Sequence, residues 1–283
     1  PVVMTNLKTE GVPAERVPYV GNVMIDTRKA NFDQAQQSTI LTDLGLERNA
    51  FNVVPLHRPS NVDDARALGR IAEVIETVQQ DLPTVFPMHP RTRSNLARLG
   101  LADRFAAMDR LTIIEPVGYL DFLKLMGEAA VVLTDSGGIQ EETTILGTWC
   151  LTLRENTERP VTIDQGTNRL VGTDPATILA AYRDCRSAKL SNPPVPDKWD
   201  GHAAERIAAI LADQRKQTPS RRCGASDRRD PRPAYRSTPS HRLSEFSSRA
   251  IAARRERFAH WPTRLNRSNA PCRGQSSIPR WWG

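Results

Sequence analysis

The sequence lacks the features of a membrane protein, a disulfide-rich domain or a zinc site. No apolar run approaches the roughly 20 residues that span a bilayer, and no signal peptide opens the chain. The four cysteines stand singly, without a Cys-x-x-Cys pair. A Walker loop and a Gly-x-Gly-x-x-Gly fingerprint are also missing. We therefore expect a cytoplasmic protein with no membrane contact, no metal and no cofactor.

Lysine is missing from the last part of the chain, which is rich in arginine, serine and proline. From residue 217 onward there are fifteen arginines and four acidic residues, so this part accounts for the whole net positive charge of the protein. It shows no helical or strand periodicity and too few apolar residues for a core. For 216–283 we favour an unselected extension over a disordered linker or an arginine-rich RNA-binding arm. Nucleic acid is not expected as a partner of the remaining chain.

Short apolar runs alternate with amphipathic stretches between residues 51 and 215. We expect strands at 52–56, 84–89, 110–116, 130–135 and 148–153, and helices at 62–80, 91–100, 119–129, 138–147, 174–187 and 200–214. Asn61 is the expected N-cap of the helix at 62–80. Apolar strands that alternate with helices form parallel βαβ units. The sequence therefore predicts a Rossmann-like doubly wound parallel sheet in the α/β class.

The first 50 residues are too short and irregular for a full domain. We interpret 1–30 as the remnant of an N-terminal domain and 31–50, with a helix near 33–44, as an interdomain connector. Residues 51–215 are then the ligand-binding domain with its C-terminal helix. The chain also begins without an initiator Met, which suggests a piece of a longer protein.

The sequence Asp-Ser-Gly-Gly follows the expected strand at 130–135. Ligands of doubly wound sheets bind beyond the carboxyl ends of the strands. Ser136, Gly137 and Gly138 lie there at the start of a helix, whose free N–H groups suit a phosphate. The alternative is a plain tight turn. Of Glu141 and Glu142, we expect one to be solvated and the other to accept hydrogen bonds from a ribose diol.

Other strand ends supply further candidates. His57 and Arg58 follow the first strand, where a histidine suits phosphate binding or acid catalysis. Arg159 could bind a phosphate, or form a surface ion pair with Glu155 or Glu158. Phe122 could stack on a base or belong to the core.

Six motifs, in this order, resemble the C-terminal half of the non-hydrolysing UDP-N-acetylglucosamine 2-epimerases over about residues 5–215. They are PLHRPSNVDD, MHPRTR, EPVGYLDFL, LTDSGGIQEE, LRENTERPVT and GTNRLVG. The resemblance implies the C-terminal domain of a two-domain GT-B enzyme, usually a homodimer. It also implies epimerisation of UDP-GlcNAc to UDP-ManNAc, by UDP elimination to 2-acetamidoglucal and re-addition. The product usually enters cell-surface polysaccharide biosynthesis in this family.

The resemblance also assigns roles to residues. Ser136, Gly137 and Gly138 are expected to hold the diphosphate, and Glu142 the ribose. His57 and Arg159 are expected to contact phosphate, with His57 as the catalytic residue for UDP departure. Phe122 is expected to lie against the uracil. Arg58 and His89 are expected to contact a UDP-sugar in an allosteric site.

The sequence departs from the family pattern at several points. Ser60 stands where the family commonly has Glu, and this difference puts the expected allosteric site in doubt. Val117 stands where some members have Gln. The acidic residues that move protons at carbon 2 belong to the N-terminal domain. We therefore expect this chain alone to bind UDP weakly and not to epimerise. A GT-B glycosyltransferase, a hydrolysing UDP-GlcNAc 2-epimerase and, remotely, RNA binding through the tail are the alternatives.

Overall fold

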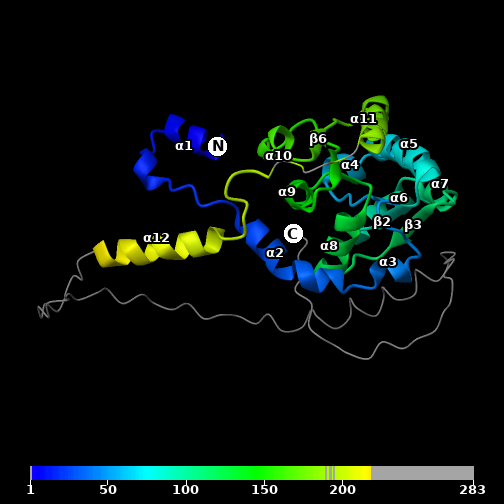
Figure 1. Cartoon of the computed structure of the whole chain (residues 1–283). Helices are drawn as coiled ribbons and strands as arrows, with labels where there is room; N and C mark the ends of the chain where they lie inside the picture. Colours follow the sequence, from blue (N-terminus) through cyan, green and yellow to red (C-terminus); the bar gives the residue numbers. More distant parts are fainter. Residues whose placement is uncertain (1, 189, 191–192, 194, 218–283) are drawn as a thin grey trace, which may run out of the picture. The chain divides into compact units, whose positions relative to one another are not determined.

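The computed structural model describes residues 2–188, 190, 193 and 195–217, drawn in colour in Figure 1. The predicted arginine-rich tail lies almost entirely outside the described residues, and so does the RNA-binding alternative. No helix within the described ranges is long and apolar enough to cross a membrane.

Six strands form one sheet, and every neighbouring pair is parallel. They are β1 (Asn52–Val53), β2 (Thr84–Pro87), β3 (Leu111–Ile114), β4 (Val131–Thr134), β5 (Trp149–Thr152) and β6 (Asn168–Leu170). The strand order is β3-β2-β1-β4-β5-β6. This order reverses direction between β1 and β4, as in a doubly wound fold. The predicted fold class is confirmed, and β6 is a strand that the periodicity did not predict.

Helices cover both faces of the sheet. In chain order, the helices of the described residues are α1 (Val2–Thr9), the 3-10 turn η1 (Ala14–Arg16), α2 (Val23–Gln36), α3 (Ile40–Asp43), α4 (Pro59–Val62), α5 (Ala65–Asp81), α6 (Pro90–Arg98), α7 (Ala102–Ala106), α8 (Tyr119–Glu128), α9 (Gly137–Leu146), α10 (Val161–Asp164), α11 (Pro175–Ser187) and α12 (Ala203–Gln217), of which α1, η1 and α12 do not cover the sheet. All six helices expected between residues 62 and 214 are present, with bounds shifted by a few residues. The short helices α4, α7 and α10 were not predicted.

Alternate strand residues supply two separate hydrophobic cores. Val54, Phe86 and Leu133 pack with α5 and α11 on one face. Val53, Val85 and Val132 pack with α3 and α8 on the other. Side chains that alternate between two faces are the geometry of a strand. Because both faces of this sheet are buried, the strand segments of the sequence are apolar at successive positions. In Figure 1, α5 and α11 accordingly lie across the sheet from α3 and α8.

Of two local predictions, one was wrong and one is confirmed only in part. The N-cap of α5 is Asp64, whose carboxylate accepts from the Ala67 amide at 2.8 Å. Asn61 is instead 2% exposed, and its amide donates to Asp135 and to the Leu153 carbonyl. The helix expected near 33–44 is present only in part, as the end of α2 (Val23–Gln36) and as α3 (Ile40–Asp43), while most of α2 lies before it. The low amphipathicity of α2 hid this helix in the sequence, because Arg28 is among its buried residues.

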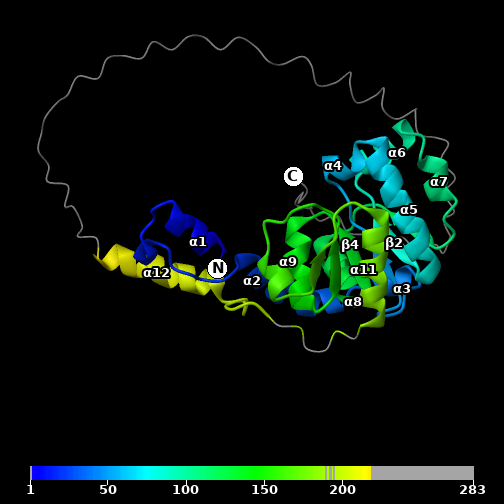
Figure 2. The same cartoon turned by 90° about the horizontal axis from the view of Figure 1, so that it is seen from above.

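Helix α2 packs against the sheet domain and also anchors the last helix. Its N-cap Asn22 accepts from the Met24 amide, and the helix lies beside α8 and α9 (Figure 2). The Asp26 carboxylate accepts from the amides of Ala203 and Ala204 at the start of α12. An acidic group at a helix N-terminus is favourable. The division of the chain at residues 30 and 50 remains a prediction.

Candidate functional site

Asp135 organises the carboxyl ends of the two central strands. It follows β4, is 0% exposed, and accepts from the backbone amides of His57 and Arg58 at 3.0–3.2 Å. Its Oδ1 also lies 3.1 Å from Nδ1 of His57, whose side chain is 29% exposed. These contacts fix the His57 ring at the point where the strand order reverses. A buried carboxylate beside one ring nitrogen orients an imidazole for proton or phosphate chemistry.

Helix α9 begins with glycines that its own backbone does not require. Ser136 is the N-cap, but its hydroxyl makes no capping bond. Gly137 and Gly138 are helical and absent from the residues with positive φ. A Cβ on Gly138 would meet nothing within 4 Å, and one on Gly137 would only approach Glu158 at 3.8 Å. No positive φ therefore calls for these glycines, and they leave open space at a helix N-terminus.

The loop that follows β5 is pinned to α9. Gln140, 0% exposed, accepts from the Thr157 hydroxyl at 2.6 Å and from Asn168 at 3.2 Å. Thr157 in turn accepts from the Arg159 amide at 2.9 Å. The Arg159 Nε lies 2.8 Å from Oε1 of Glu141, while 43% of the Arg159 side chain stays exposed. The pairing expected with Glu155 or Glu158 is wrong.

Glu158 is taken by a different arginine. Arg154, 8% exposed, donates to both Glu158 oxygens at 2.8 and 3.0 Å. This bidentate bond holds the pKa of Glu158 down to about 2. Arg58 lies 3.8 Å from the same carboxylate. Glu158 therefore connects the end of β1 to the loop that carries Arg159. Because Glu158 is paired with Arg154, Arg159 pairs instead with Glu141 of α9.

Both carboxylates of α9 are buried, so the expectation that one is solvated was wrong. Glu141 and Glu142 are each 7% exposed. Burial raises the pKa of both, that of Glu142 to about 7, while Arg159 counteracts the rise at Glu141. The Tyr119 hydroxyl approaches Glu142 at 3.5 Å. Phe122, on the same helix as Tyr119, is 8% exposed and belongs to a hydrophobic core, which agrees with the core alternative for this residue.

His89 is the N-cap of α6. Its Nδ1 accepts from the Arg91 amide at 3.1 Å. Burial lowers the pKa of His89, and the nearby His57 and Arg91 lower it further. The structure thus brings His89 near His57 and Arg58, at the ends of β2 and β1.

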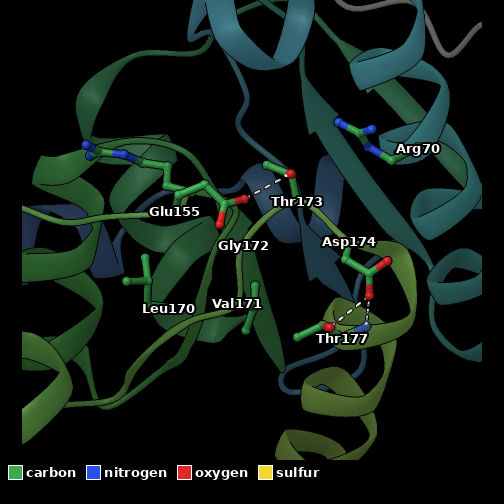
Figure 3. A pocket seen from close by; sticks show the side chains of 9 residues that line it. Arg70, Glu155, Leu170, Val171, Gly172, Thr173, Asp174 and Thr177 are labelled. Atoms are coloured by element: carbon green, nitrogen blue, oxygen red, sulfur yellow. Dashed lines mark hydrogen bonds between the residues drawn. The ribbon is translucent and has the colours of Figure 1, made fainter.

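A cavity of about 440 Å³ lies beyond the ends of β5 and β6. Arg70, Arg154, Glu155 and Thr177 line it together with residues 170–174. Figure 3 shows its acidic side chains already engaged, Glu155 with Thr173 and Asp174 with Thr177. None of the predicted site residues lines it. Nor does the described part of the chain hold a group of His, Cys, Asp and Glu side chains able to bind a metal.

Sequence reasoning missed the residues that position the others. Asp135 was quoted in its motif without a role, Gln140 and Tyr119 were given none, and Asn61 was assigned to a helix cap instead. These residues could have been noticed because they are polar and lie in or beside apolar runs. A polar group that is buried needs hydrogen-bond partners, so such residues are candidates for positioning others. Which partners they find depends on the strand order, and single-sequence patterns do not give that order.

Comparisons with known proteins show similarity in sequence and in fold. Residues 2–212 match the UDP-N-acetylglucosamine 2-epimerase family model. The chain is 36% identical over 218 residues to "UDP-N-acetylglucosamine 2-epimerase" of Methanocaldococcus jannaschii, covering 74% of the chain and 58% of that protein. A crystal structure of the Methanocaldococcus jannaschii enzyme in complex with UDP-GlcNAc and UDP has a TM-score of 0.65 at 36% identity, covering 74% of the chain and 58% of that structure.

A Pseudomonas aeruginosa relative acts on a different sugar. It is named "UDP-2,3-diacetamido-2,3-dideoxy-D-glucuronate 2-epimerase" and is 36% identical over 215 residues, covering 75% of the chain and 57% of that protein. The chain thus spans less than two thirds of the length of the curated relatives that it matches.

Proposed function

The chain belongs to the UDP-N-acetylglucosamine 2-epimerase family, and we propose that the carboxyl edge of its sheet binds the UDP part of a nucleotide-sugar. The observation that carries this proposal is the open N-terminus of α9. Two glycines without a conformational requirement leave room there, and Arg159 is held beside the same helix by Glu141. Helix N–H groups and a guanidinium together suit a diphosphate.

The proposed contacts carry the roles implied by the family resemblance over to the strand ends described above. Ser136, Gly137 and Gly138 bind the diphosphate, and Arg159 adds a positive charge to it. Glu142 accepts hydrogen bonds from the ribose diol, and Phe122 lies on the uracil side. Arg58 and His89 form a second UDP-sugar contact beside His57.

The proposed reaction is epimerisation at carbon 2 of the sugar. A base removes the carbon 2 proton while the bond between carbon 1 and the diphosphate oxygen breaks, giving 2-acetamidoglucal and UDP. A proton then returns to carbon 2 from the opposite face, and the diphosphate re-forms the bond to carbon 1. Elimination and re-addition move a proton and the UDP group but no hydride, so this route requires no nicotinamide. His57, oriented by Asp135, assists the departure of UDP as an acid or a hydrogen-bond donor.

The sugar is UDP-GlcNAc in this proposal, and a diacetamido glucuronate is the second candidate. Relatives of equal identity carry the two names. In both cases the UDP contacts stay the same. An assay of the same protein with each nucleotide-sugar distinguishes the two candidates, because only the true substrate is converted to its 2-epimer.

The reaction is tested in D2O, with a protein in which an N-terminal domain precedes this chain. Elimination and re-addition place deuterium at carbon 2 of the product, and NMR detects both the deuterium and the inverted centre. Free sugar and UDP instead would indicate a hydrolysing epimerase. A product formed only with an added acceptor would indicate a glycosyltransferase. We propose a homodimer as the working form, and sedimentation velocity of the same protein checks it.

A further inference from the structure

The sequence motif GTNRLVG, residues 166–172, supplies none of the proposed UDP contacts. It contains β6, which lies beside α9 and α10 (Figure 1). Its Asn168 is 3% exposed, and a buried amide is costly unless it is hydrogen-bonded. The Asn168 side chain accepts from the Thr152 hydroxyl at 2.6 Å and donates to Gln140 and Thr162 at 3.2 and 3.0 Å. Both polar atoms of this side chain therefore have partners inside the protein.

Both acceptors of the Asn168 amide lead to Arg159. The Thr162 hydroxyl donates to the Arg159 carbonyl at 2.7 Å. Gln140 accepts from the Thr157 hydroxyl at 2.6 Å, and the Thr157 oxygen accepts from the Arg159 amide at 2.9 Å. A backbone N–H can only donate, so the Thr157 oxygen has to accept there and pass its own proton to Gln140. These bonds close a ring, the Asn168 ring, which consists of Asn168, Thr162, Arg159, Thr157 and Gln140.

The Asn168 ring ties the backbone of Arg159 to the start of α9. Gln140 donates from its Nε2 to the carbonyl of Ser136, the N-cap of α9, at 3.3 Å. The next residue of α9, Glu141, pairs with the Arg159 side chain. One turn of α9 thus holds Arg159 by its backbone and by its guanidinium. Because most of the ring is buried, opening it would leave polar groups unsatisfied, and this makes the loop position well defined.

We propose that Asn168 is a positioning residue for Arg159, which fixes the loop through the Asn168 ring so that the guanidinium faces the N-terminus of α9. This inference rests on the proposed UDP binding at that terminus. Asn168 itself touches no phosphate, because its side chain is buried and its donors are engaged. Its effect on a ligand should therefore pass through Arg159 and require the diphosphate. A purely structural asparagine would change stability and leave the affinity of the folded chain as it is.

The test compares the whole chain with its Asn168→Ala variant, by NMR titration of UDP and of uridine. Uridine has the same base and ribose as UDP but no diphosphate. We expect Asn168→Ala to weaken UDP binding about tenfold, since a displaced guanidinium loses a charged hydrogen bond. Uridine binding should stay unchanged. In an Arg159→Ala background, Asn168→Ala should cause no further loss, because two changes that act through one side chain are not additive.

Asn52→Ala is the matched control. Asn52 is also a buried asparagine of the sheet, and its amide donates to the Val78 carbonyl and to the hydroxyls of Thr84 and Tyr182. This variant should lower stability and leave UDP binding as in the parent. A similar loss of UDP affinity in Asn52→Ala would overturn the proposal, because destabilisation alone would then explain the effect.

A second pair of variants opens the ring at one hydroxyl. Thr162→Val removes the bond to the Arg159 carbonyl and replaces Asn168→Ala if the latter does not fold. Thr162→Ser keeps the hydroxyl and should restore most of the parent affinity. Equal UDP affinities for the parent and the variants with an open ring would overturn the proposal, as would an equal loss of uridine binding or an additive loss with Arg159→Ala.

Hydrogen exchange makes the outcome independent of ligand binding. NMR follows the Arg159 amide in the unliganded chain, with the Ala130 amide, which donates to the Phe51 carbonyl, as reference. Asn168→Ala should speed exchange at Arg159 at least about tenfold and leave Ala130 unchanged, since only the loop is released.

The exchange result separates this inference from the proposed function. If exchange at Arg159 rises but the parent binds no UDP, the proposed function fails and the role of Asn168 in holding the loop stands. If exchange at Arg159 does not change, or rises equally at Ala130, this inference fails whatever UDP does.

Discussion

The Nε atom of Arg159 lies 2.8 Å from Oε1 of Glu141, on the helix that starts with Ser136-Gly137-Gly138. The pair brings the positive group of the β5 loop to the helix that carries the glycines. Because Glu141 is buried and 43% of the Arg159 side chain is exposed, the arginine is anchored on one side and accessible on the other. This is the arrangement that a phosphate-binding side chain requires.

Gly138→Ala should stabilise the fold and weaken UDP binding at the same time. Alanine is favoured over glycine in a helix by up to about 1 kcal/mol, and its Cβ would meet no protein atom within 4 Å. The same methyl group would occupy the space proposed for the diphosphate. Thermal melting and calorimetry with UDP measure the two effects.

Gly69→Ala is the matched control for that change. Gly69 is also helical, without positive φ, and a Cβ there would meet nothing within 4 Å. It should stabilise the protein similarly and leave UDP binding unchanged. Equal UDP affinities for the two alanine variants would mean that the space at Gly138 is not a ligand site.

Asp135→Asn should lower stability and disturb His57. An amide nitrogen would replace one oxygen that accepts from buried N–H groups, and such a loss costs about 1–3 kcal/mol. Chemical denaturation measures the change, with the exposed Asp109→Asn as control. A stability equal to that of the control would contradict the role assigned to Asp135.

Glu142 should make the protein less stable as the pH rises from about 4.5 to 7. Its pKa in the folded chain is about 7, above the ordinary 4.5, so the folded state holds the proton more tightly than the unfolded state. The stabilisation that this proton provides is on the order of 3 kcal/mol. It is complete below the Glu142 pKa of the unfolded state and is lost as the pH rises through the pKa of the folded state.

The measurement is the free energy of unfolding of the parent and of Glu142→Gln between pH 5 and 8. His89, whose pKa is lowered, acts in the opposite direction in both proteins and cancels in the difference. Glu158, with a pKa near 2, stays ionised throughout this range. Parallel pH curves for the two proteins would contradict the assignment.

The repeating units of the fold could be predicted from the sequence, but the contacts of the site could not. Strands such as 130–135 and helices such as 138–147 were visible because their apolar periods are local. Strand β6 was missed because its three residues, Asn168–Leu170, are only partly apolar. The glycine motif was interpreted as a phosphate site, and that remains a proposal. That its glycines are helical, and therefore unneeded by a turn, required the backbone angles.

The partners of the buried polar side chains could not be predicted for a related reason. One of Glu141 and Glu142 was expected to be solvated, yet both are buried, with α2 packed against α9 and Arg159 of the β5 loop paired with Glu141. This error arises because burial by a segment distant in sequence leaves no local pattern.

The central claim is that the edge formed by Ser136, Arg159 and Glu142 binds UDP, and calorimetric titration of UDP into the whole chain tests it most directly. We predict weak but saturable binding that Arg159→Ala reduces about 10- to 100-fold, as for the loss of a charged hydrogen bond, and that Glu142→Ala also reduces. Arg169→Ala, which removes a contact with Trp149, should leave the affinity unchanged. No binding by the folded chain, or binding that Arg159→Ala and Glu142→Ala do not alter, would contradict the account.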